Sequence, residues 1–188
     1  DEAGWDTNSD DIDLPPTDFI GYSSKNSYAH ILKAVKAKDY LRLYFDKTPF
    51  YAEGGGQIGD RGIIKSDKFE GEILDTKKHN GVYCHIVKPL RGNVSEGDAV
   101  DLEVNEITRN KTTRNHTATH LLHKALKDIL GDHVNQAGSM VSDTILRFDF
   151  SHYQALTKDE IAKVEQEVNL AIDKFLPVTA EIMSMDEA

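Results

Sequence analysis

The spacing of apolar residues changes near residue 105, and this change limits the folds open to the chain. Before it, apolar and polar residues alternate in three short runs, Tyr40–Phe45, Val82–Val87 and Ala99–Val104, as expected of half-buried β-strands. Asn80-Gly81, just before the second run, is typical of a tight hairpin turn. We therefore expect a small antiparallel β-barrel over residues 17–105.

After residue 105 the apolar spacing becomes helical. Turning about 100° per residue places Ala118, Leu121, Leu122, Ala125 and Ile129 in one stripe. Gly131 is expected to end this helix. Leu146–Phe150 alternates as a strand, and Val178–Met183 is predicted as another. Helices that alternate with strands predict an α+β domain over residues 106–188, with helices packed on an antiparallel sheet.

A second helix is expected to begin at a capping box. Thr157 and Glu160 have the spacing in which each side chain caps the other residue's backbone N–H. The expected core side of this helix contains Ile161, Val164, Val168, Ala171, Ile172 and Phe175.

Both ends of the sequence suggest a piece of a longer protein. Residues 1–16 form an acidic stretch that we expect to be a disordered linker, and the chain starts without methionine. A further capping box, Ser184–Glu187, stands just before the last residue, so we expect the second domain to be truncated there.

Charge is unevenly distributed along the chain. The net charge is −10, but residues 1–18 carry seven acidic side chains and no basic one. Residues 107–127 carry five basic side chains and no acidic one: Arg109, Lys111, Arg114, Lys124 and Lys127. This basic stretch could meet phosphates, or it could be an ordinary solvated helix face.

The compartment and the relation to membranes can also be predicted. No apolar run approaches the roughly 20 residues of a membrane span, and no signal peptide is visible. Cys84 is the only cysteine, which fits a reducing compartment. We expect a cytoplasmic protein without a membrane partner.

Three histidines lie within eight residues of the first predicted helix. On a helical wheel of this segment, His116, His120 and His123 share one polar face, nearly opposite the apolar stripe. His116 and His120 are one turn apart and could reach one cation, a spacing typical of zinc sites. The alternative is three solvated side chains. Zinc takes about four ligands, so the others must be distant single residues or lie beyond Ala188.

Four motifs in order give the chain a recognisable pattern. They are TPFYAEGGGQIGDRG (48–62), RNHTATHLLHKAL (114–126), QAGSMV (136–141) and LRFDFSH (146–152). Together they resemble the editing region of alanyl-tRNA synthetase, over a span from about Phe19 to the end. Free-standing editing proteins and the threonyl-tRNA synthetase editing domain share similar features, and the acidic start favours the synthetase.

The resemblance implies hydrolysis of serine or glycine wrongly attached to tRNA(Ala). It implies that His116 and His120 bind zinc together with a later C-x-x-x-H pair, which this sequence lacks, while His123 has no ligand role. The parent enzyme would ligate alanine to tRNA with ATP and magnesium, in a catalytic domain absent here. The expected partners are the acceptor end of tRNA(Ala) and the other domains of the synthetase.

The resemblance also suggests further site residues. Thr119 and Gln136 are the candidate catalytic residues: the Thr119 hydroxyl could touch the substrate or bond back to its own helix. Gln136 is expected before a Gly-Ser turn, where its amide could orient water or the ester. The candidate substrate-binding residues are Gly54, Gly55, Gly56, Gln57 and Arg114. The glycine-rich loop could instead be only a tight barrel turn; we expect it to face the helix of His116 and His120.

Three other functions remain open. The chain could be a free-standing trans-editing protein, a non-catalytic tRNA-binding module, or a zinc hydrolase of small molecules. Because half of the implied zinc ligands are missing, we expect low metal occupancy and weak activity from the 188-residue chain.

Overall fold

The contacts within the chain form two compact units. The computed structural model describes residues 13–179. The first unit runs through His116 and includes Ser139–Arg147; the second contains Thr117–Gly138 and the described residues from Phe148 onward. Helix α1 (Glu106–Leu130) contributes residues to both. Each unit has its own apolar core.

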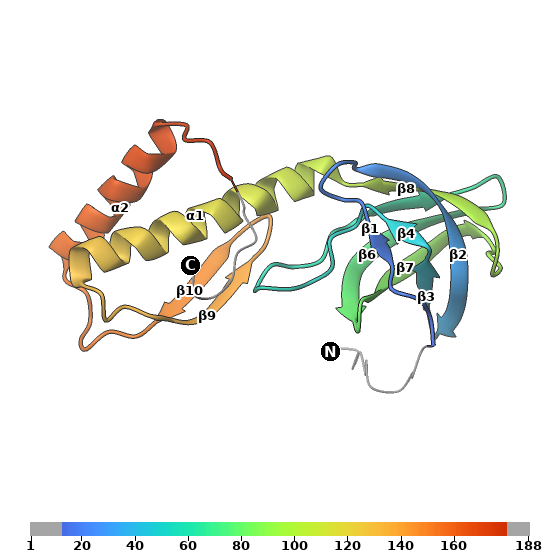
Figure 1. Cartoon of the computed structure of the whole chain (residues 1–188), viewed down its shortest axis with the longest axis horizontal. Helices are drawn as coiled ribbons and strands as arrows, with labels where there is room; N and C mark the ends of the chain where they lie inside the picture. Colours follow the sequence, from blue (N-terminus) through green and yellow to red (C-terminus); the bar gives the residue numbers. More distant parts are fainter. Residues whose placement is uncertain (1–12, 180–188) are drawn as a thin grey trace. The chain divides into compact units, whose positions relative to one another are not determined.

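The first unit contains a closed barrel of six antiparallel strands (Figure 1), as the alternating runs predict. Their order around the barrel is β2-β3-β7-β6-β5-β8, and β8 closes it by pairing with β2. These strands are β2 (Asn26–Ala37), β3 (Tyr40–Phe45), β5 (Gly62–Lys65), β6 (Phe69–His79), β7 (Val82–Gly92) and β8 (Ala99–Val104). A short parallel pair, β1 (Asp18–Phe19) and β4 (Lys47–Thr48), lies outside the barrel order.

The predicted hairpin turn is present between β6 and β7. Asn80 and Gly81 both have positive φ, 48° and 81°, as a type I′ turn requires. The alternation is much less clear in β2 and β6, because each strand has an extra residue relative to its partner: between Ile31 and Lys33 in β2, and between Ile73 and Asp75 in β6. An extra residue in a strand moves every later side chain to the other face, so a strict period of two is lost.

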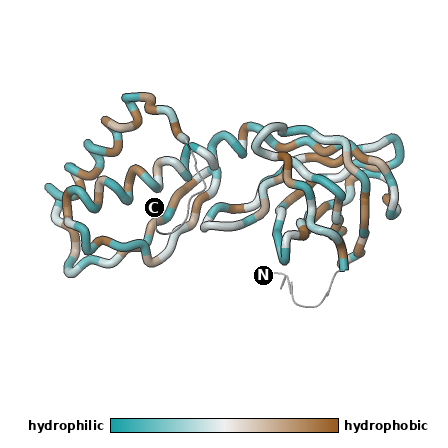
Figure 2. The backbone as a smooth tube through the Cα atoms, viewed as in Figure 1, coloured by the Kyte–Doolittle hydropathy of each residue, from teal (hydrophilic) through white to brown (hydrophobic). Residues whose placement is uncertain are grey.

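The barrel encloses the apolar core of the first unit. In Figure 2 apolar residues recur along its strands. The buried core residues are Ala29, Ile31, Leu43, Phe45, Phe50, Ile64, Phe69, Ile73, Val87, Val100, Leu102 and Val104.

The second unit is built around the later turns of α1, parts of the β9–β10 pair, and α2. Strands β9 (Gln136–Val141) and β10 (Leu146–Phe150) form a two-stranded sheet, and α2 covers Lys158–Asp173. The capping box at Thr157 is confirmed, with both reciprocal contacts present. The core of the unit contains Ala125, Leu126, Val134 and Val164, with Phe148 and Phe150 packed against it. Together the barrel, helices and sheets confirm the expected α+β class.

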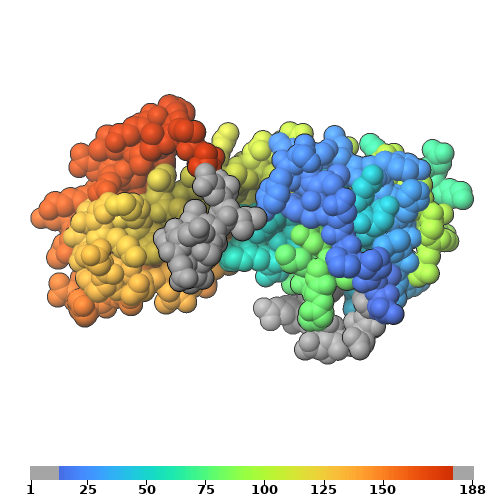
Figure 3. Space-filling view, in the orientation of Figure 1, coloured from blue at the N-terminus to red at the C-terminus, as the bar shows by residue number. Residues whose placement is uncertain are grey.

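The expected core side of α2 is only partly right. Val164 is buried and Val168 packs against the core, but Ile161, Ile172 and Phe175 are 52%, 47% and 90% exposed. Phe175 lies beyond the last helical residue and has a φ of 47°. Much of α2 is visible at the surface in Figure 3 (orange to red). A helical period identifies which residues share a face, but not how much of that face a neighbour covers.

Several expectations fall at the chain ends. Val178 and Thr179 have no regular structure, and the rest of the predicted strand Val178–Met183 lies outside the described residues, as does the capping box Ser184–Glu187. Residues 1–12 of the predicted linker also lie outside them. Within residues 13–179, no helix combines the length and apolar character needed to cross a membrane.

Candidate functional site

The glycine-rich loop forms a tight turn fixed by its backbone. The N–H of Gly54 donates to the carbonyl of Gln57 (3.1 Å), and the N–H of Gln57 donates back to Gly54 (3.0 Å). Gly55 and Gly56 have φ of 58° and 81°, a region that L side chains adopt only with strain. A Cβ built on Gly56 would lie 2.3 Å from Ser139 Oγ, so only glycine fits there.

This turn contacts the end of β9 within the first unit. The N–H of Ile58 donates to the Val141 carbonyl (3.0 Å), and the N–H of Val141 donates to the Gly56 carbonyl (2.8 Å). Gln57 itself forms an isolated parallel bridge with Val141. The turn is therefore pinned between its own hydrogen bonds and a neighbouring strand.

The side chain of Gln57 reaches helix α1. Gln57 is only 6% exposed, and its Oε1 lies 2.8 Å from Nδ1 of His116. The adjacent Asn115 donates from Nδ2 to the Ser142 carbonyl (2.8 Å). The expectation that the glycine-rich loop faces the histidine-bearing helix is confirmed at His116.

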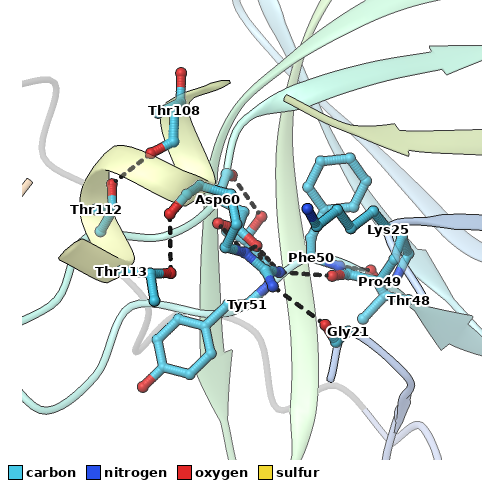
Figure 4. Close-up of polar contacts among 12 residues, drawn as sticks. Gly21, Lys25, Thr48, Pro49, Phe50, Tyr51, Asp60, Thr108, Thr112 and Thr113 are labelled. Carbon is cyan, nitrogen blue, oxygen red and sulfur yellow. Dashed lines mark hydrogen bonds and ion pairs between the residues drawn. The ribbon is translucent and has the colours of Figure 1, made fainter. Parts of the chain in front are cut away.

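A buried ion pair holds the start of α1 against the barrel, and the sequence did not suggest it. The Nε of Arg109 donates to both Asp60 oxygens (2.9 and 2.7 Å), and Nη2 also contacts Asp60. Two further Arg109 N–H groups donate to the carbonyls of Gly21 (3.1 Å) and Pro49 (3.0 Å). Figure 4 shows Asp60 beside Tyr51, whose backbone N–H donates to it (2.7 Å).

Because Arg109 pairs with Asp60, fewer side chains of the basic stretch 107–127 are available to bind phosphates. The Arg109 side chain is 13% exposed, and its guanidinium is already bound to Asp60. Lys124 pairs with Asp128 one turn later. Arg114 and Lys111 are exposed, so they are the members of the stretch best placed to meet a phosphate.

In the second unit the candidate residues lie in different environments. Thr119 is 6% exposed, His120 is exposed and Gln136, the first residue of β9, is exposed. The Gly-Ser turn expected after Gln136 is wrong, because Gly138 and Ser139 continue β9. A Cβ at Gly138 would lie 3.0 Å from Asp149 Oδ2, so this glycine allows a close approach in the strand.

The expectation that all three histidines share a polar face is wrong for His123. Its ring packs on Phe148 of β10 with centroids 5.0 Å apart. Its Nε2 is buried without a hydrogen-bond partner among the described residues. The helical wheel could not show this, because Phe148 reaches the helix from a segment 25 residues further along the chain.

His85 is committed to the barrel core and is not available as a ligand. Its Nδ1 lies 3.1 Å from the Leu43 carbonyl and its Nε2 lies 2.8 Å from Thr48 Oγ1. Burial lowers the pKa of His85 to about 3. Cys84, its neighbour on β7, is half-buried.

Two histidines that are isolated in sequence meet in the second unit. Nε2 of His133 lies 2.8 Å from Nδ1 of His152. The Tyr153 ring stacks on His133 at 4.4 Å. Because the residues are 19 positions apart and follow different elements, no sequence spacing predicted this cluster.

His116 and His120 are the two zinc ligands that the sequence pattern predicts, four residues apart on α1. They lie one helical turn apart, and the imidazole of His116 contacts an amide oxygen through Nδ1, an arrangement common behind metal-bound imidazoles. No group of three or more His, Cys, Asp or Glu within residues 13–179 is arranged to hold a metal. The donor pair has the right chemistry, and the remaining ligands are not found in this part of the chain.

Comparison with known proteins relates the chain to aminoacyl-tRNA synthetases. A family model described as tRNA synthetases class II (A) matches residues 9–108. An alanine-tRNA ligase of Fusobacterium nucleatum subsp. nucleatum is 49% identical over 174 residues, 92% of this chain and 20% of that protein. Those of Petrotoga mobilis and Alkaliphilus metalliredigens are 43% and 44% identical over 93% and 100% of this chain.

The similarity covers nearly all of this chain but only a small part of each relative. The chain spans about a fifth of the length of the alanine-tRNA ligases that it matches. The family match covers more than half of the chain and the relatives cover nearly all of it. The chain therefore belongs to the tRNA synthetases of class II (A), and its relatives within that family are alanine-tRNA ligases.

Proposed function

We propose that this chain carries part of an editing site that removes serine or glycine wrongly attached to tRNA(Ala). The observation that carries the proposal is the contact between the glycine-rich turn and α1, with 2.8 Å between Gln57 Oε1 and His116 Nδ1. Two separate motifs of the editing pattern thus meet at one point. The similarity to alanine-tRNA ligases over nearly the whole chain supports alanine and its tRNA as the context of this proposal.

The chemistry of alanine explains why such a site is needed. Serine differs from alanine by one added hydroxyl, and glycine by one missing methyl. Differences of that size give a binding pocket only limited discrimination, so a second, hydrolytic site is the physical remedy. The substrate in this proposal is the ester between the amino acid and the 3′ end of the tRNA.

The residues of this chain have the following proposed roles. Water attacks the ester carbonyl, the bond to the tRNA oxygen breaks, and that oxygen takes up a proton as the free amino acid leaves. Thr119 and Gln136 orient the water and the ester. We expect the turn Gly54–Gln57 to contact the substrate; a Cβ at Gly55 would meet nothing within 4 Å, so a ligand can approach the backbone there. The exposed Arg114 faces a tRNA phosphate.

His116 and His120 are the proposed zinc ligands of this chain. When bound, zinc would supply a Lewis acid beside the ester. Two imidazoles provide about half of the usual ligand set, so we expect weak metal binding by these 188 residues. Alanine ligation with ATP and magnesium, and contacts with the other synthetase domains, are proposed for the protein as a whole. We propose the cytoplasm as the compartment of the reaction.

Deacylation of charged tRNA tests this proposal. The 188-residue chain is expected to release serine from seryl-tRNA(Ala) slowly but above the spontaneous rate, and to leave alanyl-tRNA(Ala) largely intact. His120→Ala should abolish the acceleration. The matched control is His79→Ala, which removes another exposed histidine, at the end of β6. Equal serine release by the wild type and His120→Ala would remove the histidine pair from the mechanism.

The same samples distinguish a non-catalytic tRNA-binding module. That alternative predicts salt-sensitive tRNA binding with no serine release. One pocket on the barrel, of about 590 Å³, offers little support for that alternative, because its lining has mixed charge. Its charged lining residues are Lys65, Asp67, Lys68, Glu70, Arg91, Asp98 and Asp101. Three bases against four acids give no net attraction for a phosphate backbone.

A further inference from the structure

The backbone of Gln57 is fixed by contacts on two sides. It is held on one side by the reciprocal hydrogen bonds with Gly54 and on the other by the bridge to Val141. The neighbouring Gly56 leaves no space even for a methyl group, because Ser139 lies against it. The side chain of Gln57 therefore starts from a rigid position.

From that position the amide reaches one imidazole. Gln57 is 6% exposed, so its amide is largely withdrawn from solvent. Its Oε1 lies 2.8 Å from Nδ1 of His116, and an amide oxygen can only accept a hydrogen bond. A neutral imidazole carries one N–H, so a proton on Nδ1 leaves Nε2 as the acceptor nitrogen.

We infer that Gln57 is a positioning residue that holds His116 as its Nδ1–H tautomer, with the Nε2 lone pair directed away from the turn. Gln57 thus acts through the imidazole, whereas the open space beside Gly55 is left for the substrate. This inference rests on the proposed function only in assigning His116 to the hydrolytic site; the tautomer itself is a property of the chain alone.

The type of side chain at position 57 fits this role. Glutamine supplies a neutral acceptor, whereas a carboxylate at this largely buried position would carry a desolvation cost. Leucine has a similar shape but no acceptor. Glutamate keeps the acceptor oxygen at the same distance from the backbone. Gln57→Leu therefore removes the hydrogen bond and Gln57→Glu retains it, while both keep a side chain of similar size.

Nitrogen NMR of the metal-free chain measures the tautomer directly. With ¹⁵N-labelled histidine at a pH where imidazoles are neutral, the ring signals of His116 are assigned by their loss in His116→Gln. We expect Nδ1–H in the wild type and in Gln57→Glu. In Gln57→Leu we expect a shift toward Nε2–H. The control is Gln154→Leu, a change at an exposed glutamine, which should leave the His116 signals unchanged.

Zinc titration of the wild type, Gln57→Leu, Gln57→Glu and Gln154→Leu gives a second measurement. Removing an outer partner of a metal-bound histidine typically weakens metal binding by about 10–100-fold, so Gln57→Leu should bind zinc that much more weakly than the wild type. Gln57→Glu should bind at least as tightly as the wild type, and Gln154→Leu should match it.

Two results would overturn the inference. One is an Nε2–H tautomer for His116 in the wild-type chain, which can be seen even if Gln57→Leu does not fold. The other is a folded Gln57→Leu whose His116 signals match the wild type. Neither measurement involves tRNA. If the tautomer is as expected but serine release is absent, the proposed function fails and the role of Gln57 in orienting His116 stands.

Discussion

At the residue scale, the buried imidazole of His85 links stability to pH. It is fully buried and makes both of its ring contacts inside the barrel, with Leu43 and Thr48. Desolvation lowers its pKa from 6.5 to about 3. The folded state therefore keeps His85 neutral through a pH range in which the unfolded chain takes up a proton. Stability is present in full above about pH 6.5 and falls as the pH drops toward 3.

This difference gives a measurable prediction. Between pH 7.5 and pH 5, proton uptake by the unfolded chain should lower the free energy of unfolding by about 2 kcal/mol through His85 alone. Urea unfolding at the two pH values, compared between the wild type and His85→Gln, isolates this contribution. His79→Gln, at an exposed position, should keep the full wild-type dependence. An identical pH dependence in the wild type and His85→Gln would contradict the prediction.

Gly55 and Gly56, the adjacent glycines of the glycine-rich turn, should differ in their cost of substitution. Both have positive φ, so Gly55→Ala should destabilise the protein by roughly 1–2 kcal/mol. Gly56→Ala should cost about 1–3 kcal/mol more, because its Cβ would meet Ser139 whereas a Cβ at Gly55 meets nothing. Urea unfolding of the two variants measures the difference. An equal loss of unfolding free energy in the two variants would show that Ser139 moves aside without strain.

At the element scale, the attachment of α1 to the barrel depends on Arg109 and Asp60. Removing one partner of a buried ion pair leaves an uncompensated charge, at a cost of about 3–5 kcal/mol. Arg109→Met should therefore lower the free energy of unfolding by that amount in a urea titration. Lys111→Met, at an exposed position on the same helix, should stay within about 0.5 kcal/mol of the wild type.

A double-mutant cycle checks the physical cause. Asp60→Asn removes the charge but retains an oxygen that can accept from the Tyr51 N–H. Adding it to Arg109→Met should recover part of the lost stability, because no isolated carboxylate remains. If the double variant loses the full sum of the two single changes, Arg109 stabilises the protein by packing and not by pairing with Asp60.

Helices and strands could be predicted from the sequence where the spacing of apolar residues stayed regular along the whole element. Helix α1 ends at Leu130, just before Gly131, and α2 begins after the capping box at Thr157. Both ends could be predicted because helix caps depend on residues that are close in sequence. Strands β2 and β6 could not be recognised so easily, since their irregular register interrupts the alternation. The exposure of Ile161 and Ile172 on α2 depends on what covers a face, which no period records.

At the scale of the whole molecule, the motifs predicted that the glycine-rich loop faces the histidine-bearing helix, but not which residues make the contact. The glycine-rich loop and the histidine helix were both identified from local pattern. The pairing of Gln57 with His116 joins residues 59 apart, and that of Asp60 with Arg109 joins residues 49 apart. Several residues in each segment have donors or acceptors of the same kind, so the tertiary fold decides which of them meet.

The closure of the barrel also sets an order of events during synthesis of the chain. Strand β2 pairs with β8, and His30 lies opposite Ala99, 69 residues later in the chain. At the roughly 5–20 residues per second of ribosomal synthesis, about 3–14 seconds pass between the addition of these two partners. Throughout that interval β2 has an open hydrogen-bonding edge, to which a neighbouring nascent chain could add a strand. The arrival of β8, immediately before α1, ends that exposure.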